Sequence, residues 1–202
     1  MSLRRRASLL VFLVSALLLP TAARAQKVVT SDPAADAVSI SSDATGSDDV
    51  GLAPEETRAD LLRTTVAHTA SRVQVVTTTR EVGRGPDYLV MLRVRTPDGT
   101  FSAAAYGLGG RGPAVRLVRG NRVVDCPRSH ASSDESAARV VIAIPSSCLG
   151  APRWIRVGIG VSRYVSLDGT SNDEHWVMYV DDAHRAGDVG DDLALGPKIR
   201  RS

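Results

Sequence analysis

Residues 60–180 alternate short apolar runs with turn residues. Runs rich in Val, Ile, Thr and Arg are broken by Gly, Pro or Asp every eight to twelve positions. The clearest case is Ile155 to Val161, where an aliphatic residue occupies every second position. A period of two is typical of a β-strand with one face in a core. After the first 26 residues, no segment shows a sustained helical period.

This pattern predicts an all-β fold. We expect a two-layer antiparallel sandwich or jelly roll of about eight or nine strands. The expected strands cover residues 61–68, 72–81, 88–95, 101–106, 114–118, 122–126, 139–144, 154–162 and 175–180.

The first 25 residues are typical of a secretory signal peptide. Arg4 to Arg6 form a basic start, Leu9 to Leu19 form an apolar run, and Ala23 to Ala25 resemble a cleavage site. The apolar run is about half the ~20 residues that a helix needs to cross a bilayer. We therefore expect a secreted protein, cleaved near Ala25, with no membrane span.

The remainder divides into a leader and one domain. Residues 26–57 hold seven acidic side chains against one lysine and few large apolar residues, which predicts a disordered acidic leader. Residues 58–202 suffice for a single β-sandwich domain, with 181–202 as a loose tail or an edge strand.

Charge and aromatic content argue against a nucleic-acid partner. Loss of four arginines with the signal peptide takes the net charge from +3 to about −1, and only 4% of the residues are aromatic. A nucleic-acid surface needs clustered cations and usually stacking aromatics. We expect no nucleic-acid binding.

The chain has two cysteines, Cys126 and Cys148. In an exported protein, one disulfide is the simplest state of two cysteines. A catalytic thiol or a metal site would need a further Cys or a His at ligand spacing, which the sequence lacks.

No residue is nominated for catalysis. The four histidines occur without a nucleophile-elbow, zinc-protease or EF-hand motif. Asp181 and Asp182 begin the densest group of acids in the chain, which is a calcium candidate with Asp168 and Asp173 as contributors. The alternative is that these acids are simply solvated, and no other cofactor is expected.

Aromatic residues suggest one candidate ligand face. Trp154, Arg156 and Tyr164 share the polar face of the alternating strand, where Trp154 beside glycines would line a platform for a sugar ring. The alternative is that Trp154 covers the edge of the core or packs under a loop.

Three stretches resemble a known group of proteins: DLLRTTVAHTASRVQVV, IPSSCLGAPRWIRVGIG and GPKIRRS. The group comprises uncharacterised secreted β-sandwich proteins of high-GC Gram-positive bacteria, broadly similar to carbohydrate-binding jelly-roll modules. The resemblance spans residues 58–202 and implies one disulfide, but it carries over no catalytic residue.

These observations favour a non-catalytic secreted binding or interaction module, with a glycan or another cell-envelope component as its partner. The alternatives are a secreted hydrolase of unrecognised type and a structural exported protein.

Overall fold

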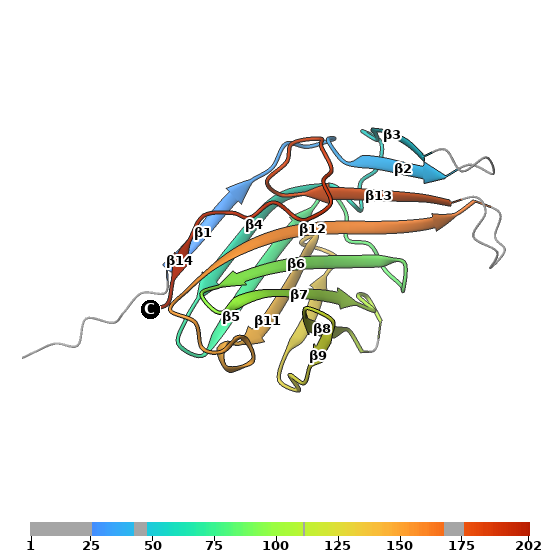
Figure 1. Ribbon diagram of the computed structural model, residues 1–202. Helices are drawn as coiled ribbons and strands as arrows, with labels where there is room; N and C mark the ends of the chain where they lie inside the picture. Colours follow the sequence, from blue (N-terminus) through green and yellow to red (C-terminus); the bar gives the residue numbers. More distant parts are fainter. Residues whose placement is uncertain (1–25, 43–47, 111, 168–175) are drawn as a thin grey trace, which may run out of the picture.

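The computed structural model describes residues 26–42, 48–110, 112–167 and 176–202. Within these ranges the chain forms fourteen strands and one 3-10 helix, η1 (Ser146–Leu149). Figure 1 shows two layers, with β6, β7 and β12 lying over β4, β5 and β11. The all-β, two-layer antiparallel sandwich predicted from the sequence is confirmed.

One layer is a five-stranded antiparallel sheet in which only β4, β5 and β11 have a strand on both sides. In spatial order its strands are β1 (Gln26–Ser31), β4 (Leu61–His68), β5 (Arg72–Thr79), β11 (Arg139–Pro145) and β10 (His130–Asp134).

The other layer is a larger antiparallel sheet whose centre is the long strand β12. In spatial order its strands are β3 (Asp48–Leu52), β2 (Val38–Ser42), β13 (Trp176–Asp182), β12 (Trp154–Ser166), β6 (Tyr88–Thr96), β7 (Gly99–Tyr106), β8 (Ala114–Arg119) and β9 (Arg122–Val124). A short strand, β14 (Ile199–Arg200), pairs with the start of β12.

The core lies between the two layers and is built from alternating positions. Ile155, Val157, Ile159 and Val161 of β12 are each at most 2% exposed. They face an equally buried set from β5 and β11 in one continuous cluster. The central strands β5, β11 and β12 therefore bury the face that their period of two predicts.

Residues 26–42 and 48–57 correct the sequence prediction of a disordered leader over 26–57, because these described parts are ordered in the structure. They form β1 on the edge of one sheet and β2 and β3 on the edge of the other. Ala37 and Val38 are 0% and 3% exposed, so they add to the buried surface. Backbone ladders satisfy edge strands regardless of side-chain polarity, which is why composition alone misjudges this segment.

The end of the chain crosses the outer face of β12 where that strand has glycines. A side chain at Gly158 would come within 2.7 Å of the Ala194 carbonyl oxygen, and one at Gly160 within 2.5 Å of Leu193. The glycines thus allow a close approach of backbone to backbone. Residues 181–202 are therefore neither wholly loose nor simply an edge strand, because they end β13, cross the sheet and then form β14.

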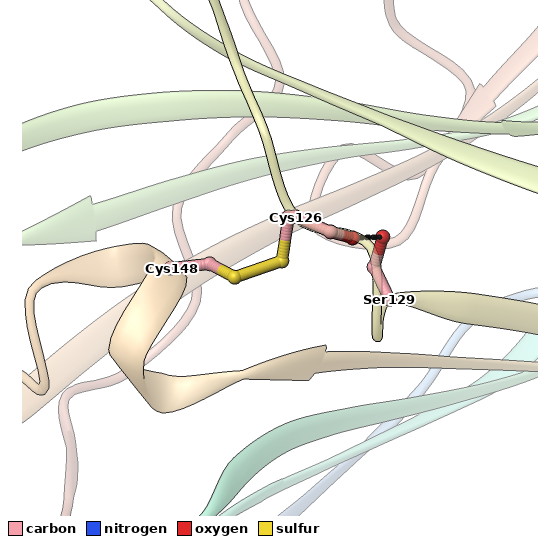
Figure 2. Close-up of a disulfide and its surroundings, with 3 residues drawn as sticks. All are labelled: Cys126, Ser129 and Cys148. Carbon is pink, nitrogen blue, oxygen red and sulfur yellow. Dashed lines mark hydrogen bonds between the residues drawn. A yellow bond between two sulfur atoms is a disulfide. The ribbon is translucent and has the colours of Figure 1, made fainter.

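The disulfide expected from the sequence is present. Cys126 and Cys148 are bonded with a Cα–Cα distance of 5.9 Å. Figure 2 shows that the bridge ties η1 to the turn after β9, where the Ser129 hydroxyl donates a hydrogen bond to the Cys126 carbonyl over 2.7 Å.

Two sequence predictions concern the first residues and membrane insertion. The predicted signal peptide, residues 1–25, lies outside the described residues. Among the residues that are described, no helix has the length and apolar character to span a bilayer.

Candidate metal centre

Four aspartates from distant parts of the sequence meet at one end of the sandwich. Asp32 follows β1, Asp36 precedes β2, Asp60 precedes β4, and Asp181 lies near the end of β13. One carboxylate oxygen from each of Asp36, Asp60 and Asp181 lies within 4.8 Å of the other two. Asp32 is close enough for these charges to change its pKa. We call these four residues the acidic cluster.

The two innermost members of the cluster are almost completely buried. Asp60 is 0% exposed and Asp181 is 4% exposed. One Asp60 oxygen, Oδ2, accepts hydrogen bonds from the Ala35 N–H at 2.8 Å and from Arg80 at 3.0 Å. Asp181 Oδ2 accepts a hydrogen bond from the Leu61 N–H at 2.7 Å. A backbone N–H group therefore holds each of the two carboxylates in place.

Several other oxygens of the cluster are buried without a hydrogen-bond partner. They are Oδ1 of Asp60, Oδ2 of Asp32 and both carboxylate oxygens of Asp36. Backbone N–H groups of Asp36 and Gly187 lie near enough to the Asp36 carboxylate to lower its pKa, but they do not reach normal hydrogen-bond geometry. Buried polar atoms are nearly always paired in proteins, so orphans gathered in one place indicate a missing partner.

Burial and mutual repulsion raise the pKa values of the cluster. The pKa of Asp32 rises to about 8, first because of burial and then because of the charges of Asp181 and Asp36. The pKa of Asp181 rises to about 7, again chiefly through burial, although the Leu61 N–H opposes the rise. Burial also raises the pKa of Asp36, with the charge of Asp60 as the next cause. Both causes, burial first and the neighbouring carboxylates second, disfavour the charged forms of these side chains when no cation is bound.

Positive charge near the cluster is scarce. Within the described ranges, Arg80 is the one basic side chain that forms an ion pair with a cluster member, through Asp60. Four carboxylates against one guanidinium leave an excess of negative charge in a buried site. Such a site is stable when it holds protons or a cation.

Of the two aspartates predicted as calcium ligands, the structure places only Asp181 in the cluster. Asp182 points to the opposite face of β13, as successive strand residues do. Its oxygens accept hydrogen bonds from the His184 and Ala194 N–H groups, and it forms an ion pair with Arg185 at 3.3 Å. Asp182 therefore holds the segment that crosses β12. Asp168 and Asp173 lie outside the described residues.

The three residues of the predicted ligand face do not form one surface. Trp154 is half-buried with the Lys198 ammonium group 4.4 Å from its ring centre. Arg156 donates hydrogen bonds to the carbonyls of Leu195 and Gly196, both at 2.7 Å. The crossing segment thus lies over β12 between Trp154 and Tyr164.

Tyr164 has a separate aromatic neighbour. Its ring stacks on Trp176 of β13 with a centroid distance of 5.9 Å. It lies ten residues along β12 from Trp154, or about 33 Å in an extended strand.

Comparisons with known proteins returned no match, whether to a protein family, to a curated protein or to a solved structure. The acidic cluster is therefore interpreted from its own geometry.

The raised pKa values predict how calcium-free protein responds to pH. Asp32 and Asp181 bind protons more tightly when folded than when unfolded, since their folded pKa values of about 8 and 7 exceed the ordinary 3.8. Their contribution to stability is complete below about pH 4 and is lost as the pH rises through 7 and 8. In EDTA, the melting temperature should fall between about pH 5 and pH 8.

Thermal scans followed by circular dichroism measure this slope. Asp32→Asn is the control variant, because it removes one titrating group and should flatten the curve. A wild-type melting temperature that rises over this range relative to Asp32→Asn would contradict the assignment.

Proposed function

We propose that this chain is a secreted, non-catalytic β-sandwich module that binds one calcium ion in the acidic cluster and presents its surface to a component of the cell envelope. The observation that carries the proposal is the gathering of buried, unpartnered carboxylate oxygens from Asp32, Asp36 and Asp60 beside Asp181.

The donor set favours calcium over other common ions. All four side chains offer oxygen, the hard ligand that Ca²⁺ takes six to eight times over in flexible arrangements. Zn²⁺ prefers sulfur and imidazole nitrogen, and the cluster offers neither. Mg²⁺ usually keeps several waters and takes one or two carboxylates, which fits four converging acids less well.

Calcium at this position would join the N-terminal segment to the rest of the sandwich. Asp32 and Asp36 lie in the chain between β1 and β2. Asp60 immediately precedes β4 of the five-stranded sheet, and Asp181 lies in β13 of the larger sheet. The ion would therefore hold both sheets and the N-terminal segment at one point. Extracellular modules use calcium sites with dissociation constants of about 10⁻⁴ to 10⁻³ M, which suit a secreted protein.

The contacts of the cluster support a structural role for the ion. Asp60 accepts a hydrogen bond from the Ala35 N–H, and Asp181 accepts one from the Leu61 N–H. These two carboxylates therefore already join segments that are distant in the sequence. A binding role for the module as a whole is suggested by the resemblance of residues 58–202 to uncharacterised secreted β-sandwich proteins, a group broadly similar to carbohydrate-binding jelly rolls.

Calorimetric titration of Ca²⁺ into EDTA-treated, dialysed protein tests the proposal. We expect one site per chain, with weaker binding of Mg²⁺. Asp60→Asn should lose most of the binding, because the amide keeps the shape of the side chain but removes its charge. Asp134→Asn is the matched control, since Asp134 is an exposed acid of β10 that pairs with Arg139 away from the cluster. Equal calcium binding by wild type and Asp60→Asn would overturn the proposal.

A further inference from the structure

A groove of about 530 Å³ lies at the other end of the sandwich from the acidic cluster. Its walls are the start of β5, the end of β11, the turn before β10, and η1. Asp60 immediately precedes β4, whereas Ser71 and Arg72 of the groove follow the last residue of that strand. The eight residues of β4 separate the two sites by about 26 Å.

The polar lining of the groove is cationic or hydrogen-bond donating. Arg72, Arg128 and His130 contribute basic side chains, and Ser71 and Ser147 contribute hydroxyl groups. No aspartate or glutamate lines this groove. Within the described part of the chain, neither arginine nor His130 makes an ion pair or a side-chain hydrogen bond. Their donors are therefore available to a ligand.

A row of residues crosses the outer face of the five-stranded sheet from the groove to the far edge. The row follows the register of five neighbouring strands. In order across the sheet, its members are His130, Ala143, Gln74, Ala67 and Lys27. Side chains in such a row share one face of the sheet. The row therefore leads from His130 in the groove to the Lys27 side chain on the far edge.

The chain holds the basic groups of the groove in defined places. Sheet register puts Arg72 opposite Pro145 and His130 opposite Ala143, which is only 4% exposed and forms the floor. Arg128 lies inside the turn that Ser129 closes onto Cys126. The disulfide connects this turn to η1 (Figure 2). Ser147 precedes Cys148 in η1.

We propose that this groove binds the oxyanion groups of an anionic glycan. Guanidinium groups match carboxylate and phosphate oxygens with two parallel hydrogen bonds, and such charge-assisted bonds are about twice as strong as neutral ones. Two arginines without carboxylate partners therefore favour a ligand that brings its own negative charge. The row towards Lys27 favours an extended ligand over a small ion. This inference rests on the proposed binding role, whose calcium site lies at the opposite end of the molecule.

Binding is measured by calorimetry on calcium-loaded protein at low salt, with an oligogalacturonate as the probe. We expect Arg72→Ala and Arg128→Ala to weaken binding about ten- to a hundredfold, as loss of a charge-assisted hydrogen bond of about 1.5 to 3 kcal/mol implies. Arg122→Ala is the matched control, because Arg122 is an exposed arginine of β9 that does not line the groove. Raising the salt should weaken wild-type binding.

Amide chemical shifts of the wild-type protein give a second measurement of where the probe binds, and this measurement needs no variant. We expect the oligogalacturonate to shift Ser71, Arg128 and Ser147 before residues of the acidic cluster. Unchanged shifts at these three residues, or unchanged affinity in both arginine variants, would overturn the proposal.

Two comparison probes separate this inference from the proposed function. Equal affinity for a neutral oligosaccharide would overturn the anionic specificity while leaving the module a glycan binder. Affinity for inorganic phosphate equal to that for the oligomer would overturn the assignment of an extended glycan. Failure of the calcium titration would concern the acidic cluster alone.

Discussion

Removal of calcium with EDTA at neutral pH is expected to lower the melting temperature by about 5 to 10 °C and to loosen residues 26–42. A ligand that binds the folded state at a hundred times its dissociation constant contributes about 2.7 kcal/mol to stability. For a chain of this size, each kcal/mol corresponds to about 2 to 4 °C. Without the ion, the repulsion among Asp32, Asp36, Asp60 and Asp181 would act first on the N-terminal segment, which is held at a sheet edge.

Thermal scans with and without EDTA measure the change in melting temperature. Amide hydrogen exchange under the same two conditions measures the loosening of residues 26–42. Protection should be lost in β1 and β2 before the central strands β6 and β12, because edge elements open at lower free energy. Asp60→Asn should show little further response to EDTA. An equal response of wild type and Asp60→Asn would place the effect of EDTA outside the cluster.

Replacement of Cys148 by Ser is expected to lower the melting temperature by about 6 to 12 °C. The bridge closes a loop between positions 22 residues apart. In the chain-entropy model a loop of this length corresponds to about 3 kcal/mol, at about 2 to 4 °C per kcal/mol. The small side chain of Ser keeps the site free of steric conflict, so the change reports mainly the lost cross-link.

The comparison is made between oxidised wild type and the Cys148→Ser variant, with reduced wild type as the control. Reduced wild type should melt close to the variant, because both lack the bridge. The same variant should also weaken oligogalacturonate binding, since the bridge fixes the turn of Arg128 against η1. If the Cys148→Ser variant melted at the same temperature as oxidised wild type, the bridge would not contribute to stability.

The sequence predicts the centre of the fold better than its edges. Each of the nine expected strands is present within a few residues of its predicted bounds. Most of them bury one face, which the sequence shows as an alternating pattern, whereas β9 was indicated by the Gly120-Asn121 turn before it. The strands that were not predicted include β1 and β10, which are sheet edges, and the two-residue β14. In β10 only Ala131 is buried, and Ser133 on the same face is polar, so the sequence shows no apolar alternation.

The acidic cluster was only partly accessible from the sequence. Asp181 stood out because it begins an acid-rich stretch, but the same reasoning gave Asp182, which points the other way. The composition of residues 26–57 predicts a disordered segment, which would leave Asp32 and Asp36 in solvent, and no motif marks Asp60. Since Asp60 and Asp181 are 121 positions apart, sheet pairing and not local spacing brings them together.

The disulfide could be predicted from the sequence alone, whereas the groove could not. Two cysteines leave one intramolecular pairing, so composition was sufficient to predict the bridge. The groove needs the register of three strands to bring Arg72 and His130 to one place, and no motif records that register.

The most direct test of the calcium site is a crystal structure of calcium-loaded protein with anomalous scattering data. We expect one calcium peak bonded to carboxylate oxygens of Asp36, Asp60 and Asp181, with Asp32 as a direct or water-mediated ligand. A well-ordered cluster without a peak, its carboxylates joined by hydrogen bonds through shared protons, would contradict the calcium site.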